Sequence, residues 1–207
     1  MKVVAMYPEV DLGKCTGCRT CERVCPVLAV KVVEKKATVD IDRCRGCAAC
    51  EQRCPSYALT MARRAEPVHV GVAVEPDMMP MIRQICARAR IHPEYIVCYC
   101  TATRAEEVVA AILKGAATPE EVSLATGART GCKVECIQPI LRLLEAAGIA
   151  PRRAEGWQWY GRTATAWEIP SEVKRRFSKR GFYFDDDIKL LEKVAGAPPT
   201  EQSCGDV

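Results

Sequence analysis

The chain has 207 residues, a net charge of +4 and 49% hydrophobic residues, so it is long enough for more than one small domain. No apolar stretch is long enough to span a membrane and the N-terminus does not resemble a signal peptide, so we expect a cytoplasmic protein. Basic residues are interleaved with cysteine loops and no nucleic-acid-reading motif is present, which argues against nucleic-acid binding.

Two cysteine runs of identical spacing, C-x2-C-x2-C-x3-C-P, lie near the N-terminus. They consist of Cys15, Cys18, Cys21 and Cys25, followed by Cys44, Cys47, Cys50 and Cys54. A cubane cluster needs four soft thiolates, three from a tight loop and one from farther along the chain. The runs therefore predict two 4Fe-4S clusters and a reducing compartment, with a zinc site or a disulfide framework as the alternative.

The two runs form an internal repeat, because a shift of 29 positions (44 − 15) also superposes Gly17 on Gly46 and Pro26 on Pro55. β-Branched residues predict a hairpin from strands 29–33 and 37–41, and a second strand pair from 1–6 and 58–62. Residues 1–65 resemble the bacterial dicluster ferredoxins, an α+β fold in which the fourth cysteine of each run crosses to the other cluster. This assigns Cys15, Cys18, Cys21 and Cys54 to one cluster, and Cys44, Cys47, Cys50 and Cys25 to the other.

A linker over residues 66–93 follows, with a strand predicted at 68–74 and a helix at 77–90. The helix has a methionine-rich face that includes Met78 and Met81, and we expect it to pack between two cluster domains. Cys86 lies beside this face without a partner in register, which is typical of a buried thiol.

A different cysteine arrangement comes next, namely the two close pairs Cys98, Cys100 and Cys132, Cys136. Four thiolates in two close pairs suit a 2Fe-2S cluster, although zinc or an empty thiol site stays open. Capping boxes beginning at Thr103 and Thr118 predict two helices between the pairs. A third helix is expected to begin near Gly131 or Cys132 and to end at Gly148.

Residues 94–150 resemble the bacterioferritin-associated ferredoxin family, the BFD-like 2Fe-2S domains, through Cys98-x-Cys100, Thr126-Gly127-Ala128 and Gly131-Cys132. The second pair here encloses three residues, where the commonest family pattern has two. The resemblance implies a small helical fold with Cys98, Cys100, Cys132 and Cys136 as cluster ligands and the second pair at a helix N-terminus. Related domains occur as free carriers, as parts of copper chaperones and as subunits of flavin-dependent dehydrogenases.

The C-terminal extension, residues 151–207, is expected to be irregular apart from a helix over 186–194, with a disordered tail that contains Cys204. Aromatic and basic residues crowd its first part: Arg152, Arg153, Trp157, Trp159, Tyr160, Arg162 and Trp167. Such residues are favoured at protein interfaces, so this part is either a partner-docking arm or a cover for the chain's own domains.

The chain contains no catalytic motif: His69 and His92 have no triad partners, and no nucleotide-binding loop is present. We therefore predict an electron-transfer subunit with two 4Fe-4S clusters and one 2Fe-2S cluster, working with a larger, flavin-containing catalytic subunit. A soluble ferredoxin or another carrier is a further possible partner. A freestanding ferredoxin, or an iron-sulfur regulatory protein that senses redox state or handles metal, is the alternative.

Overall fold

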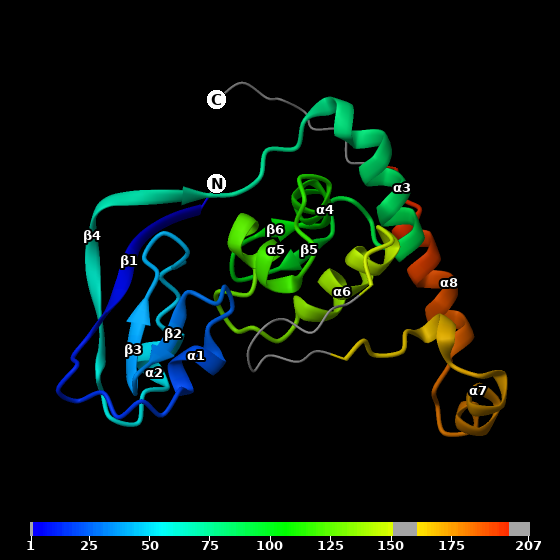
Figure 1. The fold of residues 1–207 in the computed structure, drawn as a ribbon. Coiled ribbons are helices and arrows are strands. Elements are labelled where there is room, and N and C mark those ends of the chain that lie inside the picture. The colour runs from blue at the N-terminus through cyan, green and yellow to red at the C-terminus, as the bar shows by residue number, and fades with distance from the viewer. Residues whose placement is uncertain (1, 151–160, 199–207) are drawn as a thin grey trace, which may run out of the picture.

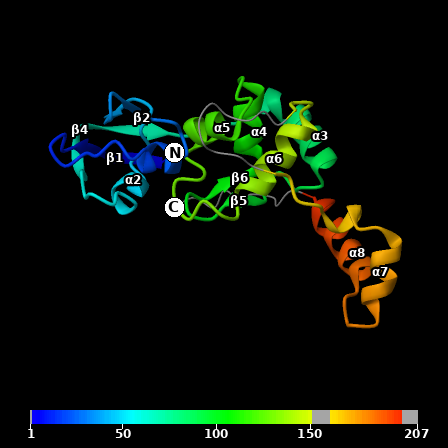
Figure 2. The same ribbon diagram turned by 60° about the horizontal axis from the view of Figure 1, so that its bottom comes forward.

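The structure, a computed structural model, describes residues 2–150 and 161–198. It is an elongated molecule with three parts in chain order (Figure 1). These are a strand-rich part (2–70), a helical part (76–150) and a C-terminal extension (161–198). Figure 2, in which the molecule is turned about the horizontal axis, shows the same order.

The strand-rich part is built from two antiparallel strand pairs, as the sequence predicts. β1 (Lys2–Val10) pairs with β4 (Leu59–Val70) from Lys2↔Val70 to Val10↔Leu59, with an irregularity between Val4 and Met6. β2 (Val30–Val33) and β3 (Lys36–Val39) form the hairpin. Its turn residues Glu34 and Lys35 both have positive φ, 49° and 61°, as a two-residue turn between twisted strands requires.

The core of the strand-rich part is made of thiols and small aliphatic side chains. Two short helices, α1 (Thr20–Val24) and α2 (Ala49–Gln52), each bury the third cysteine of one run, Cys21 and Cys50. The aliphatic residues around the buried cysteines are Val27, Ala29, Val30, Val32, Ala37, Ala58 and Leu59. Five of the twelve buried residues of this core are therefore cysteines, and the seven others are mostly small.

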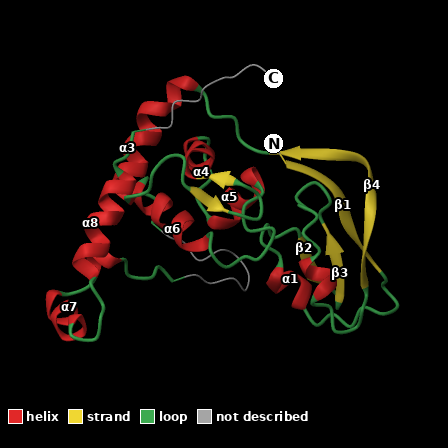
Figure 3. Cartoon of the chain, turned by 180° about the vertical axis from the view of Figure 1, so that it is seen from behind, coloured by secondary structure: helices red, strands yellow, loops and turns green. Residues whose placement is uncertain are grey.

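The helical part has a larger core of branched aliphatic residues. Its elements are η1 (Pro76–Met78), α3 (Met79–Ala89), β5 (Ile96–Cys98), β6 (Thr103–Arg104), α4 (Ala105–Leu113), α5 (Pro119–Thr126) and α6 (Ile137–Ala146). Figure 3 shows helices gathered here around the short β5–β6 pair. Fully buried residues include Ile82, Val108, Val109, Val122, Ile140 and Leu144.

One of the two predicted capping boxes is present. Thr118 Oγ1 accepts the backbone N–H of Glu121 (3.2 Å), and a Glu121 carboxylate oxygen accepts the Thr118 N–H (3.1 Å). The capping box predicted at Thr103 is wrong: α4 begins at Ala105 with Arg104 as its uncapped N-cap. Thr103 is instead buried in β6, where its hydroxyl bonds that of Thr101 at 2.8 Å.

Three further expectations differ from the structure. The strand predicted over 68–74 is not separate, since β4 runs unbroken to Val70. The third helix begins at Ile137, because residues 131–136 form turns around two cysteines, although it does end before Gly148. Helix α3 packs against α4 and α6 on the side away from the strand-rich part, so its methionine face does not lie between the two cysteine-bearing parts (Figure 1). Cys86 is buried, as predicted.

The C-terminal extension contains η2 (Ala166–Glu168), α7 (Ser171–Ser178) and α8 (Phe184–Ala195), so it is more regular than its sequence suggests. The predicted helix over 186–194 lies within α8, whose acidic first turn and Lys193 in the last turn suit the helix dipole. Trp167 anchors this part, since its indole N–H donates to Glu192 (3.2 Å) and its ring lies under Arg90 at 4.7 Å. Arg152, Arg153, Trp157, Trp159, Tyr160 and Cys204 lie outside the described residues. No helix within residues 2–150 and 161–198 is both long and apolar enough to cross a membrane.

Candidate metal centres

The groupings expected from the sequence define three candidate sets of four thiols, called here the first, second and third thiol sets. The first set is Cys15, Cys18, Cys21 and Cys54, the second is Cys25, Cys44, Cys47 and Cys50, and the third is Cys98, Cys100, Cys132 and Cys136. No group of three or more His, Cys, Asp or Glu side chains in residues 2–150 and 161–198 is arranged to hold a single metal ion.

The first thiol set combines three cysteines of the first run with Cys54 of the second. Burial raises the pKa of Cys21 to about 11, and the nearby charges of Cys18 and Cys15 add to this effect. A hydrogen bond between Cys18 Sγ and Thr20 Oγ1 (3.4 Å) is the main cause that lowers the pKa of Cys18, while the charge of Cys54 opposes it. Cys54 is therefore within electrostatic range of the first run, although 29 residues separate it from Cys25 of that run (54 − 25).

The second thiol set lines one cavity. The cavity is lined by all four of its cysteines together with Pro8, Val27, Ala29, Val30, Arg45, Ala48 and Ala49. Burial raises the pKa of Cys50 to about 12, and the charges of Cys47, Cys25 and Cys44 raise it further. Cys25, from the first run, thus lies among the cysteines of the second run.

Backbone N–H groups point at the sulfurs in both sets, which is the environment that a thiolate ligand needs. The Ala29 N–H donates to Cys25 Sγ at 3.2 Å, and the repeat-related Ala58 N–H donates to Cys54 Sγ at 3.3 Å. Further donors at 3.4 Å reach Cys15 and Cys44. Such bonds favour the anionic form of sulfur and raise the reduction potential of a cluster bound to it. The donor set and the cavity therefore fit iron-sulfur clusters.

Glycine is required where the second run turns toward β1. Gly46 has φ +63°, and a Cβ built there would lie 2.7 Å from the Met6 carbonyl oxygen. The loop that carries Cys44 and Cys47 therefore packs directly on the β1 backbone.

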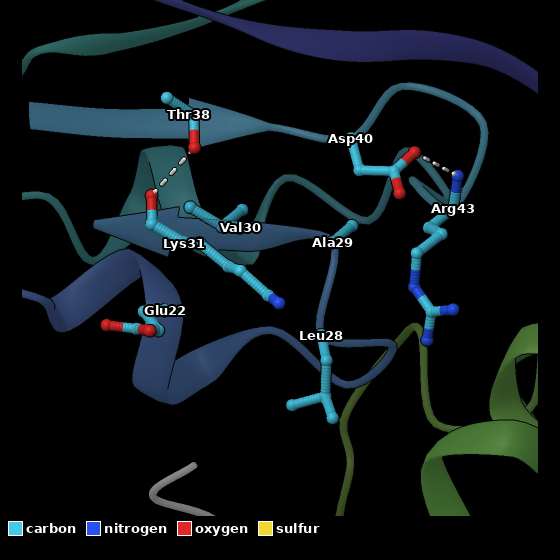
Figure 4. Close-up of a pocket in the computed structure, with 8 residues that line it drawn as sticks. All are labelled: Glu22, Leu28, Ala29, Val30, Lys31, Thr38, Asp40 and Arg43. Carbon is cyan, nitrogen blue, oxygen red and sulfur yellow. Dashed lines mark hydrogen bonds between the residues drawn. The ribbon is translucent and has the colours of Figure 1, made fainter. Parts of the chain in front are cut away.

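A charged hollow lies beside the β2–β3 hairpin (Figure 4). Its lining residues are Glu22, Leu28, Ala29, Val30, Lys31, Thr38, Asp40 and Arg43. Ala29 and Val30 line both the hollow and the cysteine cavity, so the two spaces are neighbours. No cysteine lines the hollow, which distinguishes it from the candidate metal centres.

The third thiol set lies where β5, the 131–136 turns and α6 meet. A hydrogen bond with Cys136 lowers the pKa of Cys98 to about 5, and the same bond together with burial raises the pKa of Cys136. The Cys132 N–H donates to Cys100 Sγ at 3.4 Å, and Cys132 is within electrostatic range of Cys98. Cys98 and Cys136 are buried, whereas Cys100 and Cys132 are exposed, so this set opens to the surface on one side.

The third set also has features that suit an anionic cluster. Cys136 is the N-cap of α6, which places its sulfur beside the positive end of a ten-residue helix. Gly131 lies against Cys100, and any Cβ added there would collide with that side chain. The three residues between Cys132 and Cys136 lie in the turns that precede α6, not in the helix itself.

Three of the polar contacts between the helical part and the strand-rich part come from basic side chains. Lys133 Nζ donates to the Val24 carbonyl (2.7 Å), Arg45 Nε donates to the Leu124 carbonyl (2.9 Å), and Lys2 pairs with Glu107 (2.6 Å). Sequence reasoning missed these residues, because nothing local to a lysine or arginine reveals a carbonyl partner 79 to 109 positions away.

Arg129 is a buried cation between the second and third thiol sets. Its side chain is 3% exposed and pairs with Glu120, also buried, at 3.2 Å. Burial lowers the pKa of Arg129, whereas the charge of Glu120 and those of the Cys136 and Cys25 thiolates raise it. Burial likewise lowers the pKa of Lys133, and the charges of Cys47, Cys25 and Cys50 oppose that shift.

Comparison with known families agrees with this geometry. Residues 7–68 match the family model of the 4Fe-4S dicluster domain, and residues 96–146 match that of the BFD-like [2Fe-2S] binding domain. Neither a curated protein nor a solved structure matches the chain. Both matched domains bind iron-sulfur clusters, which supports a role in electron transfer. The chain therefore contains a 4Fe-4S dicluster domain followed by a BFD-like 2Fe-2S domain, as its cysteine spacing predicts.

Proposed function

We propose that the chain is the electron-transfer subunit of a multi-subunit oxidoreductase, with the first and second thiol sets each holding a 4Fe-4S cluster and the third a 2Fe-2S cluster. When bound, such clusters accept and pass on single electrons. The observation that carries the proposal is the occurrence of three thiol sets in two contacting domains, each with at least two buried sulfurs. The side chains would hold the sulfur donors fixed, and backbone N–H groups would stabilise their charge.

Support for a partner comes from the surface around the third thiol set. Tyr95, Tyr99 and Val134 are 43%, 66% and 65% exposed, next to the exposed Cys100 and Cys132. Aromatic and aliphatic side chains around an exposed ligand would exclude water when a redox protein docks there. A flavoprotein would carry the substrate site together with its catalytic residues.

The C-terminal extension is the second surface that favours a subunit over a free carrier. Helix α8 exposes Leu190, Leu191 and Val194 (62%, 42% and 56%). The extension that carries it contacts the helical part through Arg90 on the Trp167 ring, the Arg162–Glu145 pair and the Thr163–Gln138 hydrogen bond. We propose that this segment is an arm that packs against the larger subunit, because a diffusing carrier has no need of an exposed apolar helix face.

Anaerobic purification followed by iron and sulfide analysis and EPR tests the cluster content. Full occupancy gives about ten irons per chain, from two four-iron clusters and one two-iron cluster. Cys47→Ala is expected to lose about four irons and Cys100→Ala about two, whereas Cys86→Ala, a buried thiol outside the three sets, keeps them all. Zinc in place of iron, or fewer irons in the Cys86→Ala control than in the unaltered chain, contradicts the assignment.

Native co-purification tests the subunit role. Recovery with a larger, flavin-containing chain is expected. The exposed Cys18, Cys100 and Cys132 favour the second candidate, a freestanding ferredoxin, since a diffusing partner reaches them readily. Recovery of a loaded monomer that reduces a soluble acceptor at full rate supports that candidate and excludes the subunit.

A further inference from the structure

Lys133 connects the backbone beside one candidate centre to the backbone beside another. It follows Cys132 of the third thiol set in the chain, and its ammonium donates to the carbonyl of Val24, which precedes Cys25 of the second set. A continuous bonded path therefore runs from Cys132 through one side chain and one 2.7 Å hydrogen bond to Cys25. Lys133 is half-buried, so solvent screens this contact only in part.

Arg129 supplies a second link between the same two sets. Its backbone N–H bonds Cys98 of the third set, and its buried guanidinium has the thiolates of Cys136 and Cys25 as electrostatic neighbours. The left-handed backbone at Arg129, φ 66°, lets one residue direct its N–H to one centre and its side chain toward the other. Glu120, 3.2 Å away, balances part of its charge and fixes the side chain.

Two of the hydrogen bonds between the two domains lie beside the second thiol set, one with its donor in the BFD-like domain (Lys133) and one with its donor in the dicluster domain (Arg45). Arg45, between Cys44 and Gly46 in the second set's loop, donates to the Leu124 carbonyl of α5 at 2.9 Å. The comparable cation of the first set, Lys36, donates to the carbonyls of Leu12 (2.5 Å) and Cys15 (2.9 Å), both in its own domain. Within the described residues, two of the side-chain bonds between the domains thus end next to cysteines of the second set, at Val24 and Arg45.

We propose that Lys133 and Arg129 form a cationic bridge between the second thiol set and the third. The second set is then the 4Fe-4S centre that exchanges electrons with the 2Fe-2S centre, and the first set is the 4Fe-4S centre farther along the electron path. The inference rests on the cluster content proposed above. One electron leaves one centre, which is oxidised, and enters the other, which is reduced; no bond is made or broken and no proton moves. The Lys133 ammonium, and the part of the Arg129 charge that Glu120 does not balance, stabilise the electron-bearing, more negative form of both centres.

Midpoint potentials measured by EPR-monitored redox titration of the full chain, with dithionite as reductant, test the bridge. Lys133→Met is expected to lower the potentials of the second 4Fe-4S centre and the 2Fe-2S centre. A roughly tenfold change in each reduction equilibrium corresponds to 59 mV for a one-electron couple. Lys133→Arg, which keeps the charge, should restore both potentials. A Cys18→Ala background, in which the first set lacks one sulfur, identifies the signal of the first centre.

Lys36→Met is the matched control, because it removes an ammonium that bonds backbone carbonyls beside the first set. It should shift the first centre alone. The double variant Arg129→Met/Glu120→Gln removes the guanidinium without leaving a buried carboxylate unpaired. Because it removes a pair with no net charge, it should shift the same two centres in the same direction as Lys133→Met but by less. The EPR spectrum of the unaltered chain provides a test without any substitution. It should show magnetic coupling between the reduced 2Fe-2S centre and the second 4Fe-4S centre.

The outcomes separate the two proposals. Absence of three distinct signals from the unaltered chain refutes the cluster content itself. Three signals combined with a Lys133→Met shift confined to one centre, or with coupling of the 2Fe-2S centre to the first centre, overturns the bridge and leaves the cluster content standing.

Discussion

The dicluster domain and the BFD-like domain differ in how much of their core consists of thiols. In the dicluster domain five cysteines belong to the buried core, among seven aliphatic residues such as Ala29 and Ala58. In the BFD-like domain the core is a larger set of packed helices with Leu, Ile and Val side chains, in which Cys98 and Cys136 are buried while Cys100 and Cys132 are exposed. The difference teaches that the first domain depends on its clusters for an interior, whereas the second has an interior without them.

Removal of iron should produce the largest difference in stability between the two domains. Anaerobic chelation is expected to unfold residues 2–70, because five buried thiols and seven mostly small aliphatic residues do not provide enough apolar contact. The helices α3 to α6 should stay folded. Hydrogen exchange read by mass spectrometry checks this, with protection lost in β1–β4 and kept in α4 and α6. Equal loss in both domains would show that the helical core also requires its cluster.

Replacing either of two glycines by alanine should remove a cluster of one domain and leave the other domain unaffected. Gly46→Ala forces a Cβ to within 2.7 Å of the Met6 carbonyl in a left-handed backbone, so the second 4Fe-4S centre should be lost. Gly131→Ala collides with Cys100, so the 2Fe-2S centre alone should be lost. Visible absorption and iron content measure both. Gly13→Ala, whose Cβ would meet only Asp11 at 3.2 Å, is the control that should keep all clusters.

Truncation of a core leucine sharpens the comparison within the BFD-like domain. Leu144→Ala removes a fully buried side chain from α6 and should cost about 2–5 kcal/mol of unfolding free energy. The iron content should fall less than in Cys100→Ala, because Leu144 is not a cluster ligand, although Cys98 and Cys136 belong to the same buried core. Chemical denaturation followed by far-UV circular dichroism measures the change. Leu190→Ala, 62% exposed on α8, should cost far less, and an equal cost would contradict the assignment of the core.

The smallest expected effect is at the Thr118 capping box. Thr118→Ala leaves the Glu121 N–H of α5 without its side-chain acceptor, and it should lower the unfolding free energy by about 0.5–2 kcal/mol. Thr103→Ser keeps the hydroxyl that bonds Thr101 and serves as the comparison at the threonine where no cap forms. A thermal melt measures both, and no loss in Thr118→Ala would contradict the capping role.

Prediction from the sequence was most successful for features that are defined by the spacing of nearby residues. The cysteine runs, the hairpin around Glu34 and Lys35 and the Thr118 box are all local patterns, and the structure contains the elements that they predict. The failures concern residues whose surroundings come from elsewhere. Thr103 precedes Glu106 at the right spacing, yet tertiary packing buries it in β6, which overrides the local capping signal.

Contacts between the domains were beyond prediction for the same reason. Lys133 and Arg129 are ordinary basic residues in sequence, and their significance depends on how α5 and the 131–136 turns dock on the dicluster domain. Helix α3 was predicted in place, but the packing of its face was not, because an amphipathic pattern does not specify which surface it covers.

The unbroken length of β4 determines how the chain can be divided for experiments. Val68, His69 and Val70 pair with Val4, Val3 and Lys2, beyond the residues that surround the cysteines. A recombinant fragment ending at residue 65 would strip these three partners from β1 and expose an unpaired edge that invites aggregation. Gene fragments that separate the two domains should therefore be cut after Val70, in the loop that begins at Gly71.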